Sequence, residues 1–297
     1  MRDYAIGVDI GGGSATIGVI DKIGKIVVTN KDNPIMTCKY NNVNDYIDAL
    51  CNTIKELIEQ VGGFSKIEGI GIGAPAASHH SGTIEKNPNL PWSDQKIEIV
   101  RMVEEKTNLP TYLDNDANVA ALGEWKYGKG KGLDNFIMLT LGTGLGSGII
   151  AEGKLIRGQH GLAGELGHVI VRRNEGRRCG CGRYGCAETY ASAKGVARTA
   201  IEFLEVAKKD GSSSLKKIYE NRKNKGLNSL YKEGYKEDLL ICSKDVAEEA
   251  GKGDAIALEV FEYTGKILGE AFADFVAFSD PEKVILFGGL IKSGDLL

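Results

Sequence analysis

The N-terminal stretch Tyr4-Ala-Ile-Gly-Val-Asp-Ile-Gly-Gly-Gly-Ser-Ala-Thr-Ile-Gly-Val-Ile-Asp21 gives the clearest indication of the fold of this chain. Two apolar runs flank a glycine turn, and a third run at residues 25–29 follows a second turn at Gly24. Alternating apolar runs of this length, separated by glycines, predict three consecutive antiparallel strands. Asp9 comes directly before the glycines, so we expect its carboxylate at the first hairpin turn.

The same pattern occurs a second time, starting at residue 135. Asn135–Leu141 reads as a strand, Gly142-Thr-Gly-Leu-Gly146 as the turn, and Ser147–Ala151 as the return strand. A further short run, Lys154–Arg157, follows a turn at Glu152-Gly153. Two copies of one motif order indicate an internal duplication, which is a stronger signal than either glycine cluster alone.

The remaining pattern alternates helices and strands, which is typical of an α/β chain. We expect helices at residues 43–61, at 94–107, from after Asn115 to about Tyr127, at 192–208, from Ser243, and at 255–278. Buried strands are expected at 67–72, 110–113 and 283–287, the last ending in Gly288-Gly289. The lysine-rich stretch 209–240 reads as an exposed helical excursion with loops.

The two glycine hairpins point to phosphate chemistry. Backbone N–H groups at a glycine turn can surround phosphate oxygens, and two such hairpins facing each other can hold a triphosphate. Asp9 would hold a metal-bound water beside those phosphates, because magnesium prefers a hard oxygen ligand and retained waters. Thr143 would add a hydroxyl donor. For a single hairpin, a simple tight turn is the plainer interpretation.

The sequence Asp114-Asn115-Asp116 lies where a strand gives way to a helix. The ordinary interpretation is a helix cap. The functional interpretation makes Asp116 a general base that takes a proton from a substrate hydroxyl. Asn89, in Asn87-Pro-Asn-Leu-Pro-Trp92, offers a loop amide for another hydroxyl, although Asn-Pro turns are commonly only turns.

A histidine and three cysteines form the most specific cluster of the sequence. His168, in Glu165-Leu-Gly-His168, is followed by Cys179-x-Cys181-x4-Cys186-Ala-Glu188. Three thiolates and one imidazole make a tetrahedral zinc set, and the interleaved glycines allow a tight turn around an ion. We predict a structural zinc site that holds Glu165, His168 and Glu188 beside a ligand. A disulfide pair with a spare thiol is the alternative, disfavoured because a Cys-x-Cys disulfide closes a strained loop.

Composition limits the possible partners. The chain has 297 residues, 26% charged residues and a net charge of −3. This charge argues against nucleic-acid binding, which normally requires a basic surface. No apolar run approaches the length of a membrane span. No signal peptide precedes the first strand, so we expect a cytoplasmic protein with reduced thiols.

At these residues the chain resembles the ROK family, which comprises sugar kinases and repressors of the hexokinase–actin-like ATPase superfamily. The resemblance covers essentially the whole chain. It is carried by Asp9-Ile-Gly-Gly12, Gly71-Ile-Gly-Ala-Pro75, Asn87-Pro-Asn-Leu-Pro91, Asn115-Asp-Ala-Asn-Val-Ala-Ala121, Leu141-Gly-Thr-Gly-Leu-Gly146, Glu165-x-Gly-His168, the cysteine run and Phe287-Gly-Gly289.

The resemblance implies two ribonuclease-H-like α/β domains, residues 1–115 and 116–297, with a cleft in which sugar and ATP meet. It implies transfer of the ATP γ-phosphate to the 6-hydroxyl of a hexose, with glucose expected and Asp116 as the base. It also implies a homo-oligomer, at least a dimer. The implied residues are Asn89, Asn115, Asp116, Glu165, His168 and Glu188 for sugar, Asp9, Gly11, Gly12, Thr143, Gly144, Gly288 and Gly289 for magnesium and ATP, and His168, Cys179, Cys181 and Cys186 for zinc.

The chain departs from the family pattern at two places. Ala76 follows Pro75 where the family usually has glycine, which bears on preference at the sugar's 2-substituent. The sequence also ends at Leu297, whereas relatives continue with a helix, a strand and a last helix, so we expect that C-terminal helix to be absent.

Three alternatives stay open at this point. One is a kinase for N-acetylmannosamine, N-acetylglucosamine, fructose or allose. A second is a sugar-responsive transcription regulator, disfavoured because the first strand begins by Tyr4 and leaves no helix-turn-helix. The third is a non-catalytic sugar sensor.

Overall fold

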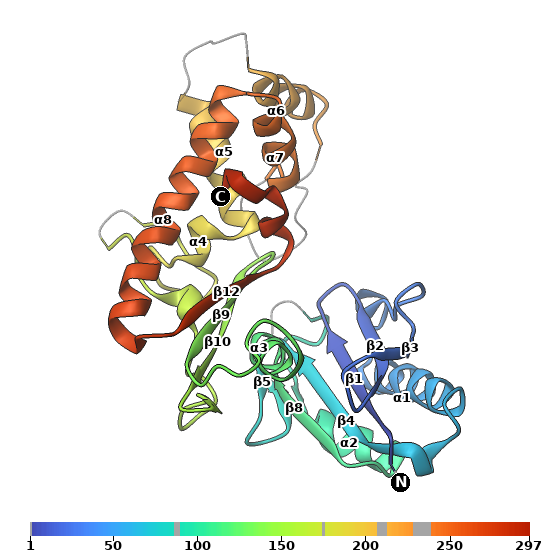
Figure 1. Cartoon of the computed structure of the whole chain (residues 1–297). Coiled ribbons are helices and arrows are strands. Elements are labelled where there is room, and N and C mark those ends of the chain that lie inside the picture. Colours follow the sequence, from blue (N-terminus) through green and yellow to red (C-terminus); the bar gives the residue numbers. More distant parts are fainter. Residues whose placement is uncertain (1, 86–89, 174–175, 207–212, 228–238) are drawn as a thin grey trace. The chain divides into compact units, whose positions relative to one another are not determined.

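A computed structural model describes residues 2–85, 90–173, 176–206, 213–227 and 239–297. The chain divides into two compact units (Figure 1). The first unit holds residues 1–133 together with 155–163, and the second unit holds 134–154 and 164–297. The boundary expected after residue 115 falls inside the first unit, because the helix that begins at Asp116 packs on two strands of that unit's sheet.

The first unit is built on a five-stranded sheet with the order β3-β2-β1-β4-β8. The expected antiparallel hairpin strands are present, and β4 and β8 run parallel to β1. The strands are β1 (Tyr4–Ile10), β2 (Ala15–Asp21), β3 (Ile26–Thr29), β4 (Ile67–Ala74) and β8 (Thr111–Asn115). The register aligns Asp9, Gly73 and Asp114 across the three parallel strands, so these residues share one edge of the sheet.

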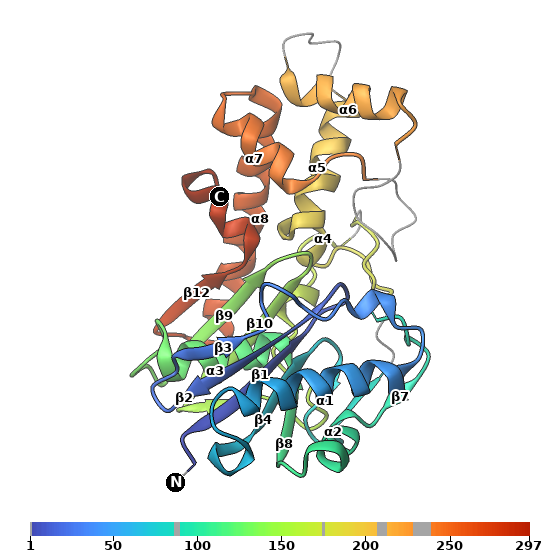
Figure 2. The same ribbon diagram turned by 90° about the vertical axis from the view of Figure 1, so that its right-hand side faces the viewer.

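Among the described residues of this unit, the α-helices are α1 (Val43–Glu59), α2 (Ile99–Thr107) and α3 (Asp116–Tyr127). Asn42 caps α1 by accepting a hydrogen bond from the backbone N–H of Asn44. Figure 2 shows α1 lying along the sheet. Short 3-10 helices lie at Thr37–Lys39 (η1) and Phe64–Lys66 (η2).

The predicted helix over 94–107 is wrong in its first part. Lys96–Ile97 forms strand β7, which pairs with β6 (Thr83–Glu85), and β6 pairs with β5 (Ala77–Ser78). Ile97 is buried by this pairing. The side chain therefore gains apolar burial as a strand residue, and the helix begins only at Ile99.

Pleating separates the two faces of this sheet. Ile70, Ile72 and Ala74 of β4 are buried in one core with the inward side chains of α1 and α2. Because successive strand residues point to opposite faces, Gly71 and Gly73 face the other side. There a Cβ on Gly73 would lie 3.5 Å from the side chain of Val119. That is an ordinary van der Waals distance, and it shows that α3 packs on this face of the sheet.

The second unit repeats this topology. Its sheet has the order β11-β10-β9-β12, with β10 antiparallel and β12 parallel to β9. The strands are β9 (Phe136–Leu141), β10 (Leu145–Ala151), β11 (Lys154–Leu155) and β12 (Lys283–Phe287). The order matches β3-β2-β1-β4, so the topological repeat predicted from the sequence is confirmed.

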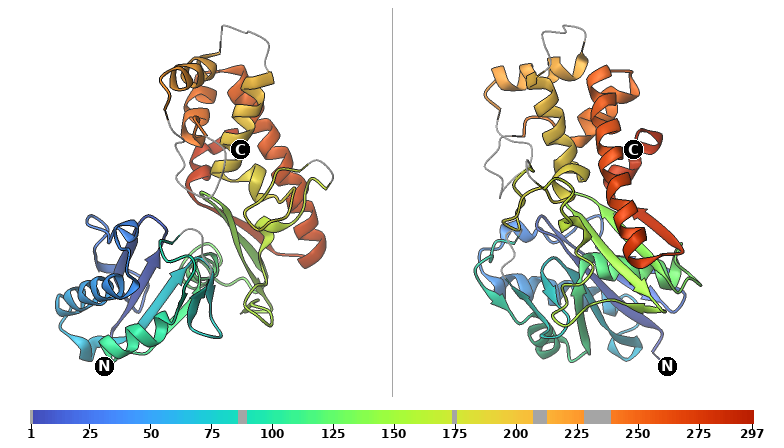
Figure 3. Two further views of the ribbon diagram at one scale, coloured as in Figure 1. Left: turned by 180° about the vertical axis from the view of Figure 1, so that it is seen from behind. Right: turned by 90° about the vertical axis from the view of Figure 1, so that its left-hand side faces the viewer.

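Besides its sheet, the second unit contains several helices. The described ones are α4 (Glu188–Ala191), α5 (Ala193–Val206), α6 (Ser214–Asn224), α7 (Ser243–Gly251) and α8 (Ala255–Ser279), with 3-10 helices η3 (Leu166–His168) and η4 (Gly289–Leu296). Figure 3 shows α5 and α8 side by side, and their apolar faces share one core with β9 and β10. Among the described helices, none combines the length and apolar character that a membrane span needs.

Candidate functional site

In the first unit, the chemistry-bearing residues gather at the carboxyl edge of the sheet. Asp9 is the penultimate residue of β1, and Asn115 ends β8 two strands away. Asp116 follows as the first residue of α3. Parallel strands place their carboxyl ends at one edge, which is where ligands bind in open α/β sheets. The structure therefore places Asp9, Asn115 and Asp116 at one edge of the sheet.

The turn between β8 and α3 is held by its own side chains. Asn115 is the N-cap of α3, and its Oδ1 accepts a hydrogen bond from the backbone N–H of Ala117 at 2.9 Å. Oδ1 of Asp116 accepts from the same N–H at 2.8 Å. The cap interpretation and the base interpretation are therefore compatible, because capping uses one oxygen of each side chain.

The electrostatics of this edge favour proton uptake by Asp116. Desolvation by the surrounding protein raises the pKa of Asp116, and the negative charge of Asp9 raises it further. Desolvation also raises the pKa of Asp9. The charge of Asp9 therefore disfavours the ionised form of Asp116, as a nearby like charge does.

The first glycine hairpin is closed by a hydrogen bond from the N–H of Gly11 to the carbonyl of Ser14, 2.9 Å long. A Cβ on Gly11 would lie 3.2 Å from that carbonyl oxygen, so the turn leaves little room for a side chain. A Cβ on Gly13 would meet open space. Gly11 and Gly12 thus form a compact turn directly after the strand that carries Asp9.

In the second unit, three predicted glycine positions meet at one place. The turn Gly142-Thr143-Gly144 joins β9 to β10, and the N–H of Gly142 bonds to the carbonyl of Gly144 at 3.0 Å. Gly288 has φ +114°, and a Cβ there would lie 2.5 Å from the Leu141 carbonyl oxygen. Only glycine fits this position, and it brings the Gly288-Gly289 turn against the end of β9.

Glu188 connects this hairpin to the cysteine cluster. Its Oε2 accepts a hydrogen bond from the N–H of Leu145 at 3.1 Å and lies where a Cβ on Gly144 would collide with it. Its Oε1 lies 3.7 Å from the sulfur of Cys179. The sequence placed Glu188 with the sugar, but did not foresee that it also contacts the glycine turn.

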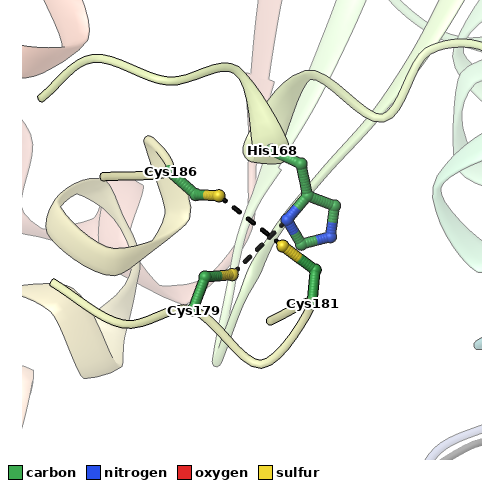
Figure 4. A group of neighbouring side chains, drawn as sticks. All are labelled: His168, Cys179, Cys181 and Cys186. Carbon is green, nitrogen blue, oxygen red and sulfur yellow. Dashed lines mark hydrogen bonds between the residues drawn. The ribbon is translucent and has the colours of Figure 1, made fainter. Parts of the chain in front are cut away.

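His168, Cys179, Cys181 and Cys186 converge, as predicted (Figure 4). Their ligand atoms all lie within 4.8 Å of one another. His168 Nδ1 is 3.5 Å from Cys179 Sγ, and Cys181 Sγ is 3.7 Å from Cys186 Sγ. Zinc–sulfur bonds of about 2.3 Å in a tetrahedron give ligand separations of about 3.8 Å. The donor set and its spacing therefore fit zinc, and the three cysteines are free thiols.

Backbone pairing explains why these residues meet. Residues 169–171 run antiparallel to 185–187, with a bridge between Ile170 and Cys186. The N–H of Ala187 donates to the carbonyl of Val169 at 2.8 Å. This short ribbon carries His168 at one end and Cys186 in its middle, so its pairing brings these two ligands to the same place.

The loop before the cluster is fixed to β10. A Cβ on Gly167 would collide with the carbonyl of Leu145, so η3 lies against the start of that strand. Glu165 is the N-cap residue of η3, and its carbonyl accepts from the N–H of His168 at 3.0 Å. Glu165, His168 and Glu188 are therefore brought together around β10, whereas Asn89 lies outside the described residues.

Two arginines that support the cluster were missed by the sequence reasoning. Arg183 Nη2 donates to the carbonyl of His168 at 2.8 Å. Arg177 pairs with Glu202 at 2.6 Å and donates to the carbonyl of Thr189 at 2.7 Å. Charged residues next to a cysteine run look like surface residues in sequence, so no local signal distinguishes Arg177 and Arg183.

Comparison with known proteins agrees with this architecture. Residues 5–297 match the model of the ROK family. The glucokinase of Halalkalibacterium halodurans is 37% identical over 302 residues, covering 99% of this chain and 82% of the relative. A ROK family glucokinase from Streptomyces griseus, solved with glucose and AMPPNP, superimposes with a TM-score of 0.75 at 33% identity, covering 99% of this chain and 85% of that one.

The family also contains regulators. The xylose repressor of Caldicellulosiruptor bescii is 31% identical over 275 residues, covering 91% of this chain and 66% of the relative. The matched residues, the repeated sheet topology and the solved relatives agree on one conclusion. This chain belongs to the ROK family, and its fold is that of the actin-like ATPase superfamily.

Proposed function

We propose that the chain is an ATP-dependent hexose kinase that phosphorylates the 6-hydroxyl of glucose, with Asp116 as the general base. The observation that carries this proposal is the environment of Asp116. It begins α3 at the carboxyl edge of the sheet beside Asp9, and burial and the Asp9 charge raise its pKa. The glucokinase relatives, 33–37% identical over nearly the whole chain, support the same activity.

Asp116 would accept the proton of the sugar hydroxyl as the new bond to phosphorus forms. A base with a raised pKa is better matched to this task, provided that it stays ionised at the working pH. Its cap bond to Ala117 orients the carboxylate before substrate binds. Magnesium, when bound, would neutralise phosphate charge, and Asp9 is the residue we assign to hold its water shell.

The sugar-binding residues we propose are Asn89, Asn115, Glu165, His168 and Glu188, together with Asp116. His168 has two nitrogens with different surroundings. Nδ1 faces the cysteine sulfurs, which leaves Nε2 to hydrogen-bond a sugar hydroxyl. Metal-bound imidazoles commonly use their second nitrogen in this way.

We assign zinc to His168, Cys179, Cys181 and Cys186. Zinc there would be structural, because four protein donors complete its tetrahedron and leave no open position. It would hold η3 and Glu188 in place. Glu188 would then keep its hydrogen bond from Leu145, so the zinc site would support both the sugar residues and the turn at Gly144.

The phosphates of ATP would be bound by the two glycine turns. We assign Gly11 and Gly12 of the first unit, and Thr143 and Gly144 of the second, to hydrogen bonds with phosphate oxygens. Gly288 and Gly289 would approach the nucleotide closely. In support, Gly288 occupies a backbone conformation that excludes side chains, and it lies against the β9 end that leads into Thr143.

A coupled ADP-release assay with ATP–magnesium over a hexose panel tests the proposal. We expect turnover on glucose well above that on fructose, N-acetylglucosamine and N-acetylmannosamine. Preference for an N-acetylated sugar would overturn the substrate assignment and direct attention to Ala76. If calorimetry shows sugar binding but the assay shows no turnover, the enzyme proposal is overturned in favour of a sugar sensor. The repressor among the relatives is the reason to test for this outcome.

A further inference from the structure

Asp114 is a buried carboxylate two residues before the proposed base. Its side chain is 8% exposed. Oδ1 accepts hydrogen bonds from the N–H of Asn115 at 2.8 Å and from Nδ2 of Asn118 at 2.9 Å. Both donors belong to the turn that presents Asp116. The Asp114 carboxylate therefore stabilises the start of α3 through two hydrogen bonds.

The second oxygen of Asp114 faces the cation of Arg157. The Nε of Arg157 lies 2.7 Å from Oδ2. His79 is the other titratable group close by, with Nδ1 at 4.0 Å from Oδ2 and at 3.0 Å from the carbonyl of Leu113. A buried charge without a partner is costly, so removing the guanidinium should disturb the carboxylate and everything it holds.

Arg157 reaches Asp114 from a segment that follows β11 of the second unit. Residues 155–163 belong to the first unit, and the chain returns to the second unit at Gly164. There the hydroxyl of Ser147 donates to the carbonyl of Gly164 and accepts from the N–H of Leu166 at 3.0 Å. The segment is thus fixed at Arg157 on one side and at Gly164 on the other.

We propose that the Arg157–Asp114 ion pair positions two parts of the active site at once: the Asn115–Asp116 turn and the segment leading to Glu165. This inference rests on the proposed function, since it assigns Asp116 and Glu165 their roles there. Arg157 and Asp114 are positioning residues and touch no substrate. Through Asp114 the pair orients the base, and through the chain it fixes the start of the sugar-binding loop.

The test compares Arg157→Met, Arg157→Lys and Asp114→Asn with Arg101→Met. Arg101 is a matched control in the same unit, because it forms an exposed ion pair with Glu98 and Glu105 on α2. We expect Arg157→Met to lower kcat by about 100-fold, the loss that a misplaced reacting group produces. The KM for ATP should stay within about threefold, since the glycine turns are untouched. Arg157→Lys keeps the charge and should recover part of kcat.

Hydrogen–deuterium exchange provides a readout independent of activity. Arg157→Met should raise exchange in peptides covering 114–121 and 158–168, whereas Arg101→Met should raise it in neither. The double variant Asp114→Asn with Arg157→Met should be less impaired in kcat than the product of the two single effects. Wild-type kcat and exchange in folded Arg157→Met would overturn the inference. So would full additivity in the double variant.

The two proposals fail in different ways. If the wild-type protein turns over no hexose, or if Asp116→Asn stays fully active, the proposed function fails whatever Arg157 does. A different result separates the two: the wild-type protein is active, Asp116→Asn is inactive, and Arg157→Met behaves like Arg101→Met. In that case the proposed function is supported, and the positioning role of the Arg157–Asp114 ion pair is wrong.

Discussion

Replacing Asp116 by Asn should separate catalysis from folding more clearly than any other single change. Asn keeps an oxygen that can accept the 2.8 Å hydrogen bond from Ala117, and Asn115 continues to cap α3. Burial and the Asp9 charge raise the pKa of Asp116, which means that the native state disfavours its ionised form. A neutral side chain removes that penalty, so the free energy of unfolding at pH 7 should be unchanged or slightly higher.

The expected loss of activity is large in comparison. General-base catalysis contributes about 10²- to 10⁴-fold, which is about 2.7–5.4 kcal/mol of transition-state stabilisation at 1.36 kcal/mol per decade. The coupled ADP-release assay on glucose should show kcat reduced by that factor. Glucose titration calorimetry should show a Kd within a few-fold of wild type, because Asp116 is one of several proposed hydroxyl partners.

Urea denaturation and a control variant complete this test. Asp32→Asn serves as the control, since Asp32 lies exposed in a loop of the same unit, and it should match wild type in kcat. Asp116→Asn with near-normal kcat would refute the assignment of the base. A loss of kcat that merely follows a large drop in unfolding free energy would refute the claim that the residue acts in catalysis rather than in folding.

Three further predictions follow from the same geometry. Because the pKa of Asp116 in the free protein lies above its ordinary value of 3.8, the acid limb of kcat/KM against pH should have its midpoint above 3.8. A midpoint at or below 3.8 would contradict the desolvation argument. Chelation should remove one zinc ion per chain, as measured by metal analysis, and should weaken glucose binding before it weakens ATP binding. Unchanged glucose affinity in the metal-free protein would contradict the proposed support of the sugar-binding residues by the zinc site. Ala76 has φ +53°, and left-handed backbone costs about 1–2 kcal/mol. The added chain entropy of glycine offsets about 0.4–1 kcal/mol of this, so Ala76→Gly should raise the free energy of unfolding in urea by about 0–1.6 kcal/mol. A lower free energy of unfolding would show that the methyl group of Ala76 makes stabilising contacts.

Much of the fold could be predicted because its signals are local. The apolar spacing of α1 and α8 and the strand–glycine–strand pattern of both hairpins depend only on neighbours in sequence. The prediction over 94–107 was wrong at its start for the opposite reason. Ile97 pairs with Ile84 of β6, and that partner is remote in sequence. Helical spacing alone could not reveal it.

The repeated hairpins, the four metal-ligand types and the helix that begins at Asp116 could be predicted from the sequence, because each follows from spacing along a short stretch. Only the tertiary structure decided that Asp9 and Asp116 share one sheet edge, and that Glu188 contacts the turn at Gly144. It alone joined Arg157 to Asp114, 43 residues apart. Electrostatic coupling acts over a few ångströms of space, and parallel strands and crossing segments bring together charges that no sequence spacing connects.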